Sequence, residues 1–140
     1  MISVRIFIPL LLFLVCSFQY QTEEARVLPK ELHGNWQLGK LYTLKTPRAI
    51  TTYNVFVSIE EDGKVSGFSG CNRFNTTLKL RNDSLLFGTL LRSRKFCEEE
   101  YLDVEDALLA GFKNTNRYLY KNNTLTLLNG NRKEIQLIRQ

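Results

Sequence analysis

The chain has 140 residues, a length typical of a single domain. Apolar residues make up 44% and charged residues 24%, which excludes a disordered tail, a collagen-like repeat and a protein with several membrane spans. The formal charge of +5, from 19 Lys and Arg against 14 Asp and Glu, bears on solubility and on weak attraction to anionic surfaces. One His and three Cys leave few side chains for catalysis or metal binding, so we expect no cofactor and no metal.

The first 17 residues are predicted to be a secretory signal peptide. Residues 6–15 are uncharged and mostly large aliphatics, but a membrane-spanning helix needs about 20 such residues. Val15 and Ser17 are small enough for a signal peptidase site, which predicts cleavage between Ser17 and Phe18. An uncleaved N-terminal anchor is the alternative.

Cys16 offers a second cleavage point, because bacterial lipoproteins are cut just before a cysteine that then carries lipid. The preceding residue is normally Gly, Ala or Ser, whereas here it is Val15, so lipidation is the less favoured alternative. Both routes export the domain. We therefore expect a periplasmic or outer-membrane-associated protein, with secretion as a further possibility.

Cys71 and Cys97 remain after cleavage at Ser17, an even number in an oxidising compartment. A disulfide between them would close the loop 71–97 and stabilise the domain by roughly 3.5 kcal/mol on the chain-entropy model. Two buried free thiols are the alternative. The sequence favours the bridge.

After a polar linker over 18–31, the chain alternates as short strands do. Apolar residues occupy every second position over 53–59, and Asp62-Gly63 predicts a hairpin turn into a strand over 64–68. The strand pattern also covers 36–44, a hairpin over 78–87, the segment 89–96 and several short stretches of 117–140.

The period becomes helical over about 99–112, where Tyr101, Val104, Leu108 and Phe112 form one apolar face. A lone amphipathic helix of this length is marginal, so it must pack on the sheet. The expected fold class is α+β: a curved antiparallel sheet of about seven short strands with one α-helix, in a domain over 32–140.

Candidate chemical sites are few, and we expect no catalytic residue. His33 has no partner at a useful spacing and is interpreted as a surface or helix-end residue. The acids of the predicted helix lack the spacing of a calcium loop and are interpreted as a solvated, dipole-stabilised face: Glu98, Glu99, Glu100, Asp103, Glu105 and Asp106.

Arg92, Arg94 and Lys95 form a small basic stripe. If the segment is a strand, Arg92 and Arg94 share a face and could meet the helix acids or anionic headgroups, so peripheral membrane association is possible. Without interleaved aromatics or a large basic excess, we expect no binding to nucleic acid.

The segments Ser-Gly-Phe-Ser-Gly-Cys-Asn-Arg-Phe over 66–74 and Ser-Arg-Lys-Phe-Cys over 93–97, with the acidic helix and a closing strand, resemble the META domain. This family includes the bacterial HslJ-type heat-shock lipoproteins of the cell envelope. The resemblance covers about 32–138. It implies a stress-related envelope protein without enzymatic activity that acts on a protein partner not identified by the sequence.

Within this motif, Gly70 permits a backbone conformation closed to other residues, and the amide of Asn72 can bond backbone groups in a bend. Ser93 could do the same from the facing strand. We interpret these residues as a structural link between the second hairpin and the helix. The alternative function is a carrier of lipid or of a small hydrophobic ligand, because a curved sheet crossed by one helix can leave an apolar cavity.

Overall fold

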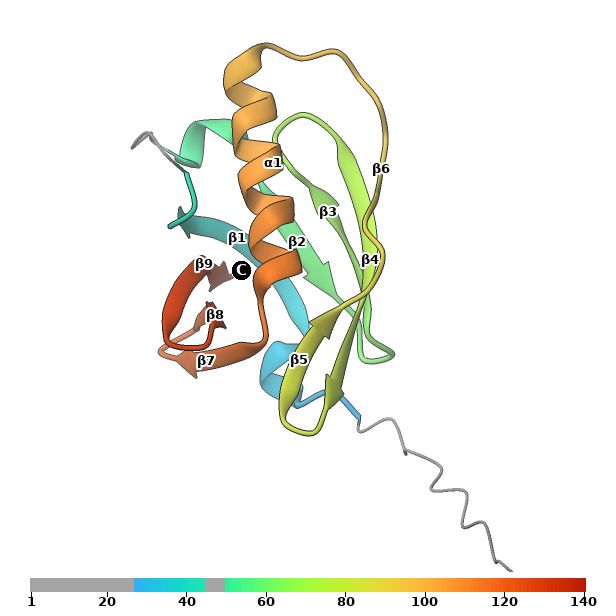
Figure 1. Ribbon diagram of the computed structural model, residues 1–140, viewed down its shortest axis with the longest axis vertical. Helices are drawn as coiled ribbons and strands as arrows, with labels where there is room; N and C mark the ends of the chain where they lie inside the picture. The colour runs from blue at the N-terminus through green and yellow to red at the C-terminus, as the bar shows by residue number, and fades with distance from the viewer. Residues whose placement is uncertain (1–26, 45–49) are drawn as a thin grey trace, which may run out of the picture.

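The computed structural model describes residues 27–44 and 50–140, which form a curved antiparallel sheet with one long helix against it (Figure 1). The predicted signal peptide, Cys16 and residues 18–26 of the predicted linker lie outside the described residues. The elements in chain order are η1 (Lys30–Leu32), β1 (Gly34–Leu41), η2 (Ile50–Tyr53), β2 (Phe56–Ile59), β3 (Lys64–Phe68), β4 (Arg73–Arg81), β5 (Ser84–Phe87), β6 (Leu91–Arg92), α1 (Glu99–Asn114), β7 (Arg117–Lys121), β8 (Thr124–Asn129) and β9 (Arg132–Arg139).

The strands lie in the order β5-β4-β3-β2-β1-β9-β8-β7, with β6 pairing beside β5 on β4. β1 to β5 follow one another as antiparallel neighbours, and β7 to β9 form a second meander whose last strand pairs with β1. The two ends of the curved sheet come together where the Leu85 N–H donates to the Asn116 carbonyl at 2.9 Å, although the sheet does not close. The α+β class and the curved sheet are confirmed.

Local sequence explains the turns and the ends of the elements. At the predicted hairpin, Gly63 has a φ of +83°, and the Lys64 N–H donates to Asp62 Oδ1 at 3.0 Å. The helix extends two residues beyond the predicted end, to Asn114. The described part of the chain has nine strands instead of about seven, and residues 117–140 supply three of them.

The prediction of a strand over 89–96 was wrong. Only Leu91 and Arg92 pair with β4, and Ser93 continues that edge by donating its N–H to the Arg73 carbonyl at 3.0 Å. Beyond Ser93 the chain leaves the sheet and arches over to the start of α1 (Figure 1). This arch is necessary because α1 lies against the sheet, so the connecting segment must leave the edge of β4 to reach it.

The helix packs its apolar stripe onto the inner face of the sheet. Val104, Leu108 and Phe112 are fully buried, and the Phe112 ring lies 4.7 Å from the Phe87 ring and 5.6 Å from the Phe74 ring, centroid to centroid. Each such side chain contributes roughly 1.5–3 kcal/mol by leaving water. Trp36, also fully buried, donates its indole N–H to the Leu32 carbonyl at 3.2 Å. Side chains therefore fill the space between helix and sheet.

The N-terminal part of the described chain also belongs to the packed core. Leu28 and Leu32 are buried against the same core cluster as the strands. The Arg139 guanidinium in β9 donates to the carbonyls of Glu31 and His33 at 2.7 and 2.8 Å, which fixes η1 against the sheet. Among residues 27–44 and 50–140, no helix has the length and apolar character needed to cross a membrane.

Candidate functional site

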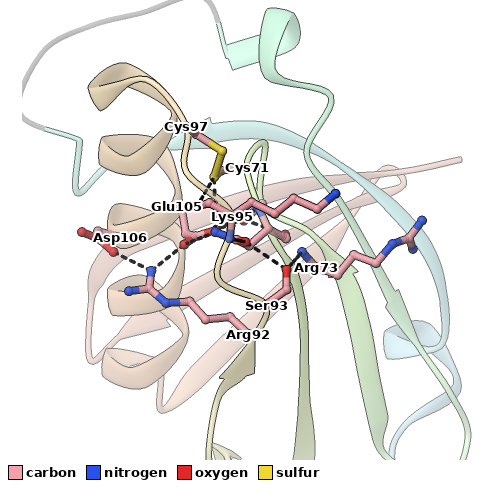
Figure 2. Close-up of polar contacts among 10 residues, drawn as sticks. Cys71, Arg73, Arg92, Ser93, Lys95, Cys97, Glu105 and Asp106 are labelled. Atoms are coloured by element: carbon pink, nitrogen blue, oxygen red, sulfur yellow. Dashed lines mark hydrogen bonds and ion pairs between the residues drawn. A yellow bond between two sulfur atoms is a disulfide. The ribbon is translucent and has the colours of Figure 1, made fainter.

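A group of polar side chains joins the turn before β4, the segment after β6 and the middle of α1 (Figure 2). We call it the Glu105 cluster; its members are Ser69, Asn72, Arg92, Ser93 and Glu105. Ser69 and Asn72 lie in the turn between β3 and β4, Arg92 ends β6, and Glu105 lies in α1. Ser69, Asn72 and Ser93 belong to the predicted motif, whereas Arg92 lies in β6 and Glu105 in the helix.

Glu105 is the centre of this cluster. Its side chain is 1% exposed, and both carboxylate oxygens accept hydrogen bonds. Oε1 accepts from Asn72 Nδ2 at 3.1 Å and from Arg92; Oε2 accepts from the Asn72 backbone N–H at 3.1 Å and from the Ser69 hydroxyl. A buried carboxylate is tolerated only when it is paired and hydrogen-bonded in this way.

The interpretation of Glu105 as part of a solvated helix face was wrong. The residue follows Tyr101 by four positions and precedes Leu108 by three, so its spacing places it in the apolar stripe of α1. That spacing was the signal in the sequence that could have identified it. Glu98, Glu99, Glu100, Asp103 and Asp106 are exposed, as predicted.

Asn72 uses both ends of its amide. Oδ1 accepts from the Lys95 backbone N–H at 2.8 Å and from the Ser93 hydroxyl at 2.9 Å. Nδ2 donates to Glu105 Oε1 and also lies 3.2 Å from Cys71 Sγ. Since these partners come from β4's turn, the segment after β6 and α1, one amide connects three segments of the chain.

Arg92 closes the cluster on its solvent side. Its guanidinium Nη1 lies 2.5 Å from Glu105 Oε1 and 3.0 Å from Asp106 Oδ1, and its side chain is 44% exposed. The hydrogen bond to Asp106 and the charge of Glu105 raise the pKa of Arg92, despite an opposing effect of partial burial. The prediction that Arg92 could meet the helix acids is confirmed, whereas Arg94 makes no ion pair in the described part of the chain.

Cys71 and Cys97 form a disulfide with Cα atoms 6.0 Å apart (Figure 2). The bridge ties the turn before β4 to the residue just before α1 begins. Gly70, next to Cys71, has a φ of +96°, a conformation that L side chains rarely adopt. The structure thus brings Gly70, Asn72, Ser93 and the two cysteines together, as the sequence predicted, and adds Ser69 and Glu105.

His33 lies outside this cluster. It is the residue that ends η1, with its backbone N–H donating to the Lys30 carbonyl at 3.2 Å, so the helix-end interpretation is confirmed. Within the described ranges, no group of three or more His, Cys, Asp or Glu side chains is placed to hold a metal ion.

The geometry of the cluster suits a structural role. Ser69 is fully buried, and its hydroxyl is engaged with Glu105 and with the backbone of Asn72. A serine nucleophile needs a base and access to substrate. Here the neighbouring carboxylate is already shared among Ser69, Asn72 and Arg92. The hydrogen bonds hold α1 onto the sheet.

A shallow depression of about 530 Å³ lies beside the disulfide and opens to solvent. Its lining includes Gly70, Phe96, Cys97, Glu98 and Tyr101. The depression is on the outside of the molecule at the arch before α1, separate from the filled space between helix and sheet.

Solved structures show the same fold. An NMR structure of a protein from Burkholderia xenovorans is 22% identical, with a TM-score of 0.61, over 76% of this chain and 81% of that one. A second NMR structure is 23% identical, with a TM-score of 0.60, over 81% and 95%. The crystal structure of a DUF4847 family protein from Bacteroides vulgatus is 13% identical, with a TM-score of 0.55, over 76% and 92%.

No curated protein matches the chain. The family model of the META domain matches residues 30–140, which include every strand and α1. The matched range includes all residues of the Glu105 cluster. The chain is therefore a member of the META domain family.

Proposed function

We propose that this protein is an exported, non-enzymatic component of the bacterial cell envelope that acts in stress through contact with another protein. The observation that carries the proposal is the full engagement of the Glu105 cluster. The polar residues of the motif are used to fasten α1 to the sheet, and Glu105, Asn72 and Ser69 are buried. Because these residues serve the fold, we propose that the protein acts through its outer surface.

Export is supported by two features. The N-terminal 17 residues have the pattern of a signal peptide, and Cys71 and Cys97 are bridged, as is typical of oxidising compartments. Cleavage between Ser17 and Phe18 places the domain in the periplasm, whereas lipidation of Cys16 places it at a membrane.

The filled core supports a protein partner over a carrier function. A carrier needs an enclosed apolar cavity of several hundred Å³. In the described chain, the fully buried rings of Phe74 and Phe112 pack against each other between helix and sheet, and the fully buried Trp36 packs beside Tyr120.

The test is crosslinking in the intact envelope of the producing cell, followed by identification of the captured protein and by cell fractionation. We expect the chain in the periplasmic or outer-membrane fraction, attached reproducibly to one partner, with more product after heat or membrane stress. Recovery in the cytoplasm would contradict export. Copurified lipid found by mass spectrometry would favour the carrier function.

A second experiment separates architecture from catalysis. Asn72→Ala should lower the melting temperature, because Asn72 holds three segments together. An Asn72→Ala variant that melts like the parent but loses a chemical turnover would contradict the non-enzymatic function.

A further inference from the structure

The arch between β6 and α1 carries the most exposed aromatic side chain of the described residues. Phe96 is fully exposed, and Leu91, at the start of the same segment, is 65% exposed. Burial of a Phe side chain releases roughly 1.5–3 kcal/mol, so covering Phe96 with another molecule is favourable. The depression lined by Cys97 and Tyr101 lies directly beside it.

Charges are distributed unevenly around Phe96. Arg94 and Lys95 precede it, and Glu98 and Glu99 follow Cys97. All four of these side chains are exposed, and none makes an ion pair with another residue of the described ranges. Each copy of the chain therefore presents an unpaired basic half and an unpaired acidic half within one short segment.

This order is self-complementary under a twofold axis. If two copies of 94–99 run antiparallel with the axis between Phe96 and Cys97, Arg94 lies opposite Glu99 and Lys95 lies opposite Glu98. Phe96 of each copy then lies over the depression beside Cys97 of the other. Twofold interfaces use the same patch on both subunits. In this arrangement the basic residues of each copy pair with the acidic residues of the other.

We infer that residues 91–99 form a docking surface for a second copy of this chain, with Phe96 as its apolar anchor. Phe96 and the four charged residues of this surface are not members of the Glu105 cluster, and the inference does not depend on the proposed function. A patch centred on one short segment is small, so the dimer is weak and its formation depends on concentration and salt.

The segment that forms this surface is held in place by the rest of the fold. Lys95 is fixed by the hydrogen bond from its backbone N–H to Asn72 Oδ1, at 2.8 Å, and Cys97 is fixed by the disulfide. A surface that is already ordered loses little conformational entropy on association.

The test is a charge-exchange experiment with the protein isolated from the producing cell. One variant carries Arg94→Glu and Lys95→Glu, and the other carries Glu98→Lys and Glu99→Lys. Each variant alone places like charges across the axis, so its dimerisation in analytical ultracentrifugation should weaken about tenfold or more. An equimolar mixture places opposite charges throughout and should associate at least as strongly as the parent.

A third test variant and a matched control accompany the exchange. Phe96→Ser should weaken the dimer, whereas Leu119→Ser, at an exposed position of β7, should leave it unchanged. Circular dichroism checks that every variant is folded, which matters most for Glu98 and Glu99 at the start of α1. A parent that stays monomeric at all accessible concentrations, or a mixture that fails to associate, would overturn the inference. Neither result would bear on export or on the partner found by crosslinking.

Discussion

Glu105 in α1 accepts hydrogen bonds from both the backbone and the side chain of Asn72, each at 3.1 Å. The two residues lie 33 positions apart in sequence, and the pair fixes the helix to the turn before β4. Glu105 lies in an otherwise apolar stripe and can therefore fix the position of the helix on the sheet. If the helix slid along the sheet, the buried carboxylate would lose its hydrogen-bond donors.

Glu105→Ala should lower the free energy of unfolding by about 3–5 kcal/mol, because it removes the acceptor of four donor groups, on Ser69, Asn72 and Arg92. Urea unfolding of the purified protein measures this loss. Asp106→Ala is the matched control: it removes the neighbouring carboxylate, which also binds Arg92 but is 70% exposed, so it should cost less than about 1 kcal/mol. Equal losses for the two variants would contradict the central role of Glu105.

Asn72→Ala and Ser93→Ala should both destabilise, in that order. Asn72 is buried and makes bonds at both ends of its amide, so its removal should cost about 2–4 kcal/mol. Ser93 is exposed and links only to Asn72 and to the Arg73 N–H through its hydroxyl, so its removal should cost about 1 kcal/mol. Thermal melting ranks the two, and the reverse order would be inconsistent with the geometry.

The disulfide between Cys71 and Cys97 should be present in the protein as isolated from the producing cell. Thiol titration of the denatured, unreduced mature protein should find no reactive thiol from Cys71 or Cys97. Replacing both by Ser should lower the free energy of unfolding by roughly 3.5 kcal/mol, because the denatured chain regains the freedom of the closed loop. Two reactive thiols per mature chain would show that the bridge is not formed.

Gly67 in β3 should resist substitution because of a close approach to its neighbours. A Cβ there would lie 2.7 Å from Cζ of the buried Phe74 ring and would also meet the Phe56 carbonyl oxygen. Gly67→Ala should therefore cost about 1–3 kcal/mol through overpacking. Gly130→Ala is the comparison, because a Cβ at that turn meets no atom within 4 Å and only the backbone conformation opposes it. Urea unfolding should show the larger loss at Gly67.

Tyr118 should make stability depend on alkaline pH. Burial raises the pKa of Tyr118 above its ordinary value of 10.0. The Glu31 carboxylate, which accepts a hydrogen bond from the Tyr118 hydroxyl at 3.2 Å, raises this pKa further. The folded state thus favours the protonated phenol, and its contribution to stability is complete below about pH 10 and is lost as the pH rises through the raised pKa.

Unfolding by urea at a series of pH values from 8 to 11 tests this relation. Tyr118→Phe should lose less stability than the parent between the two ends of the series. Glu31→Gln removes one of the causes and should bring the pKa of Tyr118 part of the way down in a spectrophotometric titration. An unchanged titration in Glu31→Gln would contradict the contact.

Local patterns predicted the parts of the fold that depend on neighbouring residues. The alternation over 53–59 and the Asp62-Gly63 turn both describe what a short segment does alone. The turn was correct, whereas the strand is limited to β2 (Phe56–Ile59), because Tyr53 ends η2. The segment 89–96 was wrong as a strand because its path is decided by where α1 must begin, a distant constraint. Glu105 was missed because a charged residue was assigned by type to the polar face, although its spacing placed it on the apolar one.

The order of strands in the sheet has a consequence for when the domain can form. β9, residues Arg132–Arg139, lies between β1 and β8. The last strand in the sequence is therefore an inner strand of the sheet. A chain still being synthesised lacks that strand, and β1 then has an open side. The complete sheet therefore cannot assemble until residue 139 has emerged.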